Sequence, residues 1–164
     1  DLSNSTSSLQ SLLGKSLLIS TNLARDASDI LEAQNDEMSS ALDRYEEVLK
    51  LVPECFKLLS SFESTNSPEA LSEILNKGWD LKRGLGSRIS TQEIEGLFAE
   101  IRKLGAIGGK LCGAGGGGFL WMLFSCVQDR SGVLNKYANS AVEVGLDVEG
   151  SRVLVNDFGR STDI

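Results

Sequence analysis

Glycine is concentrated in one short stretch of the chain, KLCGAGGGGFLWMLF, at residues 110–124. Five glycines fall within the six positions 113–118, and large apolar side chains follow at once. Glycine at this density marks a backbone that bends where a Cβ would clash, or that closely approaches another group. Successive backbone N–H groups in such a loop can form a concave nest that binds an anion. The alternative is a glycine-rich hairpin or bulge packed beneath another segment.

Three glycine motifs that bind nucleotides do not fit this stretch. Gly113, Gly115 and Gly118 have the spacing G-x-G-x-x-G, but that fingerprint needs a helix after the turn, whereas an apolar run that indicates a strand follows here. A Walker A loop fails because Leu104 replaces its first glycine and Leu111 replaces its Ser or Thr. A protein-kinase loop fails because the chain has no histidine for the H-R-D motif. The sequence therefore predicts a strand–loop–strand whose backbone is the binding surface.

Composition excludes several classes of site. Without histidine, no imidazole base is available for Ser-His-Asp or Cys-His catalysis, and a zinc site lacks a usual ligand. The cysteines Cys55, Cys112 and Cys126 show no C-x-x-C spacing and are interpreted as buried thiols that pack as small hydrophobes. The composition therefore excludes catalysis by an imidazole base and disfavours a zinc site.

Charge and hydropathy narrow the possible partners and the location. The formal charge of −7 over 164 residues argues against nucleic acid as a partner. No apolar run approaches the roughly 20 residues of a membrane span, so no membrane partner is expected. No secretory leader is recognisable, and a cytoplasmic location is expected.

The charges are unevenly distributed along the chain. Residues 22–70 carry four basic and eleven acidic side chains, whereas residues 77–110 carry seven basic and four acidic ones. The basic stretch leads into the glycine loop, where a bound anion would favour it. A solvated helix face would show the same composition.

The N-terminal half is expected to be mainly helical. The Ser-rich residues 1–14 are predicted to be a linker or frayed end, and the start at Asp1 indicates a fragment of a longer protein. Residues 16–20 read as a short buried strand. A long helical stretch from about residue 22 carries an apolar stripe, and Pro53 predicts a kink or break within it. The stripe could pair with a partner helix as a coiled coil, but we expect it to pack in the core of the domain. Its members are Met38, Leu42, Tyr45, Leu49, Val52, Phe56 and Leu59.

The C-terminal half alternates helices and strands. A helix is expected from Pro68, capped by Ser67, to a terminator at Gly84 or Gly86, and a second from a capping box at Ser90–Glu93 to Gly105. Strands are expected at about 108–112, 119–127 and 151–158, with a helix at about 131–144. The strands flanking the glycine loop are consecutive, which favours an antiparallel α+β sheet.

The glycine motif and its flanking segments resemble those of a known family. GGKLCGAGGGGFLWMLF is similar to the third conserved motif of the galactokinase, homoserine kinase, mevalonate kinase and phosphomevalonate kinase superfamily, the GHMP kinases. Residues 78–111 and residues 20–34 (STNLARDASDILEAQ) look most like the sugar-kinase branch typified by D-glycero-D-manno-heptose 7-phosphate kinase. The likeness extends over about residues 15–158.

The resemblance implies a fold and a set of binding residues. Residues 15–164 would be the ferredoxin-like α+β C-terminal domain of a two-domain kinase, with its sheet covered by helices. Its glycine loop would close on the phosphates of ATP and on the substrate. The implied phosphate- and substrate-binding residues are Gly113, Ala114, Gly115, Gly116, Gly117 and Gly118, with Thr21 and Arg25 from the first strand-to-helix segment, and Lys110.

The family's N-terminal domain, with its ATP loop, catalytic acid and magnesium ligands, is absent from this chain, so the resemblance implies no catalytic residue and no metal ligand here. ATP and Mg would therefore act in a longer parent, with the N-terminal kinase domain as partner and a sugar or sugar phosphate as substrate, and this chain alone would be inactive. Lys77, Lys82, Arg83 and Arg88 would suit a phosphorylated substrate. The alternative is a non-catalytic module that senses a small molecule or binds a partner helix through the apolar stripe.

Overall fold

The computed structural model describes residues 6–24, 26–60, 68–147 and 150. None of the helices it describes is long and apolar enough to cross a membrane. Its elements, in chain order, are α1 (Thr6–Leu13), β1 (Ser16–Ser20), α2 (Ala27–Asp36), the short 3-10 helix η2 (Met38–Ser40), α3 (Leu42–Ser60), α4 (Pro68–Lys82), α5 (Gln92–Lys103), β2 (Ala106–Leu111), β3 (Phe119–Phe124), α6 (Val127–Lys136) and β4 (Ala141–Glu143).

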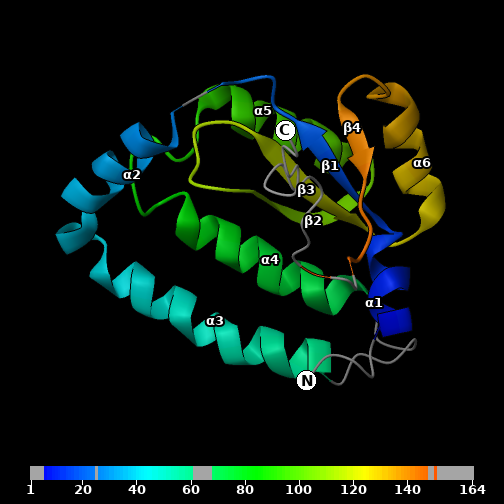
Figure 1. Cartoon of the computed structure of the whole chain (residues 1–164), viewed down its shortest axis with the longest axis horizontal. Coiled ribbons are helices and arrows are strands. Elements are labelled where there is room, and N and C mark those ends of the chain that lie inside the picture. Colours follow the sequence, from blue (N-terminus) through cyan, green and yellow to red (C-terminus); the bar gives the residue numbers. More distant parts are fainter. Residues whose placement is uncertain (1–5, 25, 61–67, 148–149, 151–164) are drawn as a thin grey trace, which may run out of the picture.

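The strands form one antiparallel sheet in the order β2-β3-β1-β4 (Figure 1). The expected α+β class and the antiparallel pairing are therefore confirmed. Strands β2 and β3 are neighbours in register, with Lys110 opposite Trp121 and Leu111 opposite Leu120. The glycine loop thus joins two adjacent strands, as the sequence predicted.

The main core lies between the sheet and the helices α4, α5 and α6. Ile94 and Ile101 of α5 are fully buried, as are Leu17 and Ile19 of β1 and Met122 of β3. A fully buried side chain of this size stabilises the fold by about 1.5–3 kcal/mol. Because both loop-bearing strands are anchored in this core, the loop starts and ends on fixed points.

Helix α4 lies along the edge strand β2. A Cβ at Gly108 would come within 2.7 Å of the Cβ of Ser72, so glycine is what permits this close approach. The amide of Asn76 donates to the carbonyl of Ile107 at 3.1 Å. Helix α4 therefore covers an edge that would otherwise be open to pairing, and α3 packs against α4 on its outer side (Figure 1).

Two predicted segments near the termini of the domain differ in the structure. Residues 6–13 form helix α1 rather than a linker, because Leu12 is 4% exposed and packs with Leu71 and Leu123. The helix predicted at 131–144 begins at Val127 and ends at Lys136, because Ala141–Glu143 pairs with β1 as strand β4. The strand predicted at 151–158 lies outside the described residues.

Pro53 does not break α3, which runs without interruption from Leu42 to Ser60. Because Pro53 has no N–H group, the carbonyl of Leu49 loses its helical hydrogen bond. Both residues lie on the exposed side of the helix, where water can donate to that carbonyl instead. The inner face of α3 instead runs through the half-buried Val48, the buried Leu51 and the half-buried Cys55. The prediction that the apolar stripe is core is therefore wrong for most of its length. Its exposed members are Met38, Leu42, Leu49, Val52 and Phe56.

The predicted caps are placed correctly to within a residue. Helix α4 begins at Pro68, and Ser67 lies outside the described residues. The N-cap of α5 is Thr91 rather than Ser90, since the Thr91 hydroxyl accepts from the amide of Ile94 at 3.4 Å. Gly105 follows α5 with a φ of +108°, the left-handed conformation expected at this position.

Candidate functional site

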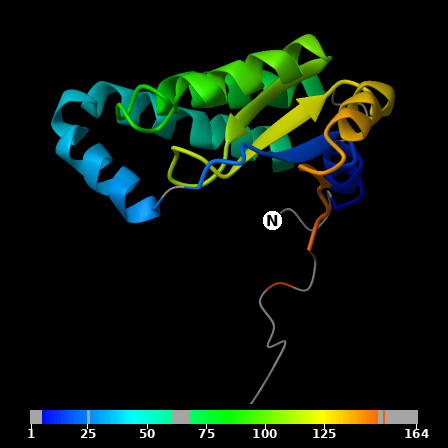
Figure 2. The ribbon, with the colours of Figure 1, turned by 90° about the horizontal axis from the view of Figure 1, so that it is seen from above.

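The glycine loop extends from the β2–β3 edge of the sheet toward α2 (Figures 1 and 2). Its first and last glycines, Gly113 and Gly118, have φ values of +76° and +95° and open space where a Cβ would stand. Positive φ is strained for other residues, so the backbone conformation itself requires glycine at these two positions.

The middle of the loop is held by two other segments. A Cβ at Gly115 would lie 2.8 Å from the Cα of Ile89, and one at Gly117 would lie 2.3 Å from the carbonyl oxygen of Leu23. The amide of Gly116 donates to Ile89 at 2.8 Å, and the amide of Gly118 donates to Leu23 at 3.2 Å. Packing beneath other segments, the alternative raised by the sequence, therefore accounts for the glycines at 115 and 117.

Four amides of the loop remain available. The N–H groups of Gly113, Ala114, Gly115 and Gly117 donate no hydrogen bond to any residue that the structure describes. Gly115 and Gly117 are buried, and a buried amide without a partner is costly. Such a set of unpaired donors on a fixed backbone is what a phosphate-binding nest provides.

These residues line a cavity of about 340 Å³ between the loop and the start of α2. Gly113, Ala114, Gly115 and Gly117 all border it, as does Gly118, whose amide donates to Leu23, whereas Gly116 does not. On the opposite wall, Ala27 begins α2, whose N-terminal amides add a positive partial charge. The cavity is therefore lined mainly by backbone and small side chains, with donors on one side.

Thr21 joins the strand β1 to the loop. Its amide and its hydroxyl both donate to the carbonyl of Gly118, at 2.8 and 3.0 Å. The hydroxyl oxygen also accepts from the amide of Leu23 at 3.3 Å. Thr21 therefore positions the loop, and its contact with a phosphate or substrate stays a prediction. Arg25 lies outside the described residues.

Lys110 and Lys82 occupy different places from those expected. Lys110 lies on β2 and lines a separate cavity between α3 and α4 rather than the one at the loop. Lys82, at the end of α4, donates a hydrogen bond to the carbonyl of Gly113. Burial, and next the charge of Lys110, lower the pKa of Lys82. The sequence reasoning included Lys82 only as one of four basic residues, and the helix register that brings it to the loop follows from how α4 packs on β2.

The other members of the basic stretch are not gathered at the loop. Arg83 makes ion pairs with Asp80 at 2.7 Å and Glu95 at 2.9 Å. Arg88 lines a separate cavity of about 310 Å³ with Asp26 and Asp29. Lys77 is exposed on α4. The structure thus leaves Lys82 as the member of this stretch that contacts the glycine loop.

Neither metal-binding nor disulfide chemistry is found in the part of the chain that the structure describes. No three His, Cys, Asp or Glu side chains gather there to hold a metal ion. All three cysteines are free and half-buried rather than fully buried. Burial raises the pKa of the Cys55 thiol, which disfavours the reactive thiolate.

Comparison with known proteins identifies a matching family and similar proteins. The family described as GHMP kinases C terminal matches residues 55–142. The D-glycero-alpha-D-manno-heptose 7-phosphate kinase of Campylobacter jejuni is 27% identical over 110 residues, 67% of this chain and 32% of that protein. The mevalonate kinase of Methanothermobacter thermautotrophicus is 38% identical over 72 residues, 43% of this chain and 23% of that protein.

Solved structures with a similar fold include mevalonate kinases. That of L. major, in complex with R-mevalonate, superposes with a TM-score of 0.62 at 18% identity, over 76% of this chain and 37% of that one. That of methicillin-resistant Staphylococcus aureus gives 0.53 at 22% identity, over 79% and 41%. The chain therefore spans about a third of the length of the curated heptose kinase it matches, and still less of the curated mevalonate kinase.

Proposed function

Because the chain belongs to the GHMP kinases through their C-terminal domain, we propose that it is the C-terminal half of an ATP-dependent sugar or sugar-phosphate kinase. The observation that supports a phosphate-binding role is the set of unpaired amides at Gly113, Ala114, Gly115 and Gly117, four residues that border one cavity. The likeness to a heptose 7-phosphate kinase over 110 residues supports a sugar phosphate. Mevalonate is the competing substrate class, supported by similarity over 72 residues.

Phosphoryl transfer is catalysed mainly by positioning and by stabilising charge on the transferred group. In this proposal the loop amides donate to phosphate oxygens, and Thr21 and Lys82 hold the loop through the carbonyls of Gly118 and Gly113. In this proposal, metal binding and the catalytic acid belong to an N-terminal kinase domain in a longer parent. We expect this chain alone to be inactive.

The binding role can be tested on the chain itself by NMR with inorganic pyrophosphate. The amide signals of Gly113, Ala114, Gly115 and Gly117 should move most, because their N–H groups are unpaired. Those of Gly116 and Gly118, which already donate to Ile89 and Leu23, serve as internal controls. If saturating pyrophosphate leaves the four unpaired amide signals unchanged, the loop does not bind phosphate.

The activity is tested by ATP-dependent phosphorylation of a panel of hexoses, heptoses, their phosphates and mevalonate. The assay compares this chain with the same chain joined to its native upstream sequence. Turnover of a sugar or sugar phosphate by the longer protein only is the expected result. Turnover of mevalonate alone would contradict the sugar assignment and leave the kinase assignment standing.

A helix-mediated interaction module is the second candidate, and the exposed stripe favours it. Leu49, Val52 and Phe56 on α3 are 68%, 60% and 58% exposed, an unusual cost for a helix that faces only water. Activity in neither protein, together with self-association of this chain that Leu49→Asp abolishes, would favour the module over the kinase.

A further inference from the structure

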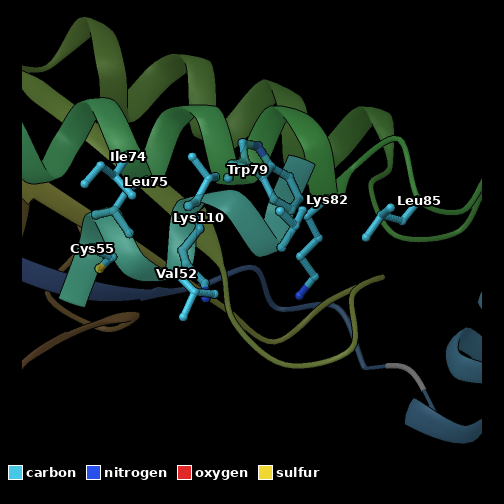
Figure 3. Close-up of a pocket in the computed structure, with 11 residues that line it drawn as sticks. Val52, Cys55, Ile74, Leu75, Trp79, Lys82, Leu85 and Lys110 are labelled. Carbon is cyan, nitrogen blue, oxygen red and sulfur yellow. The ribbon is translucent and has the colours of Figure 1, made fainter. Parts of the chain in front are cut away.

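A second cavity lies between α3 and α4, away from the cavity at the glycine loop. It measures about 290 Å³ and is walled by apolar side chains from both helices (Figure 3). Leu51 and Val52 of α3 face Ile74, Leu75 and the buried Trp79 of α4 across it. A concave apolar pocket with a few convergent polar groups is the usual form of a small-molecule site.

The two charged side chains that line this cavity are both donors, and the Cys55 thiol lines it as well. Lys82 and Lys110 border it, and Figure 3 shows both side chains ending on the same side, away from Ile74 and Leu75. Neither ammonium group makes an ion pair with a described residue.

Two neighbouring lysines without a counter-ion repel each other, and burial adds to the cost of keeping them charged. Both effects lower the pKa of Lys82. An anion bound between the two ammonium groups would remove this repulsion, and an apolar chain attached to it would cover the exposed side of Val52. The pocket therefore has the chemistry to bind an apolar chain at one end and an anion at the other.

We propose that this pocket binds a small amphipathic anion, a short aliphatic chain with a carboxylate or phosphate head held by Lys82 and Lys110. One water-sized group occupies about 30 Å³, so the 290 Å³ cavity holds roughly ten heavy atoms. Because Lys82 has three N–H donors and gives one to the carbonyl of Gly113, two others remain for the bound head group. This site goes beyond the proposed kinase function, and its test is independent of the kinase assay.

Isothermal titration of the chain with octanoate, octyl phosphate, octanol and octylamine tests the proposal. Saturable binding of octanoate or octyl phosphate, with octanol weaker and octylamine weakest, is expected, and the two anions show which head group is preferred. Lys82→Gln and Lys110→Gln should each weaken binding of the better anion by about tenfold. Lys77→Gln, an exposed lysine on the same helix, is the matched control and should change nothing.

A second variant fills the cavity without touching its charges. Gly78 borders it, and a Cβ there would meet only Leu51 Cδ1, at 3.6 Å, so the fold accommodates Gly78→Ala. Gly78→Leu extends into the cavity and should abolish anion binding, with circular dichroism confirming that both variants are folded. Equal binding of octylamine and octanoate, an equal loss in Lys77→Gln, or undiminished binding by folded Gly78→Leu would each overturn the proposal.

Discussion

The substitution that most directly tests the packing of the glycine loop is Gly115→Ala. The residue has a φ of +128°, which is strained for alanine by about 1–3 kcal/mol. The added Cβ would also lie 2.8 Å from the Cα of Ile89 and 3.0 Å from its carbonyl oxygen. These are backbone atoms that cannot rotate away, so a shift costing about 1–3 kcal/mol more is expected. The free energy of unfolding should therefore fall by about 3 kcal/mol or more.

Gly113→Ala is the matched control for this prediction. Gly113 also has a positive φ, +76°, but nothing lies within 4 Å of its added Cβ. Only the conformational strain remains, about 1–2 kcal/mol. Equilibrium unfolding in urea, followed by circular dichroism, measures both variants. If the two lose equal stability, or if Gly115→Ala loses none, the contact between the loop and Ile89 does not hold the loop as described.

Three further perturbations test other parts of the structure. Gly108→Ala should destabilise the fold by about 1–3 kcal/mol, because its Cβ would meet Ser72, whereas Gly96→Ala, at an exposed position of α5, should stabilise it by about 0.5–1 kcal/mol. Urea unfolding that ranks the two variants otherwise would contradict the α4–β2 contact. Leu51→Ala removes a side chain that is 6% exposed and should lower the free energy of unfolding by about 2–5 kcal/mol. Leu49→Ala removes one that is 68% exposed and should change thermal stability little, so a large loss of stability in this variant would mean that the stripe is buried. Burial, and next the hydrogen bond with Glu100, raise the pKa of Tyr137 from 10.0 to about 12, so its contribution to stability is complete below pH 10 and is lost as pH rises through about 12. Ultraviolet titration of tyrosinate should show a late step that Tyr137→Phe removes; a late step that persists would assign it to Tyr45.

The local patterns in the sequence determined most of the secondary structure and the nature of the loop. Pro68 begins α4 and Gly105 ends α5 because their backbone preferences act within one turn of helix. The apolar run after Gly118 predicts β3 because an all-apolar segment of that length has to be buried. Where two structures compete for the same residues, local preference was insufficient. Residues 141–143 join β4 rather than a helix because β1 offers them a partner strand.

The tertiary structure alone decided which groups meet and which faces are covered. The stripe on α3 and the buried face beside it are both apolar, so periodicity could not tell which one packs on α4. The carbonyls of Ile89 and Leu23 occupy the amides of Gly116 and Gly118, which leaves four others unpaired, and backbone carbonyls have no signature in a sequence. Lys82 reaches Gly113, while Lys110 faces another cavity, because these positions depend on the register of α4 against β2. Long-range contacts of this kind are set by packing of the whole domain, which no local stretch of residues encodes.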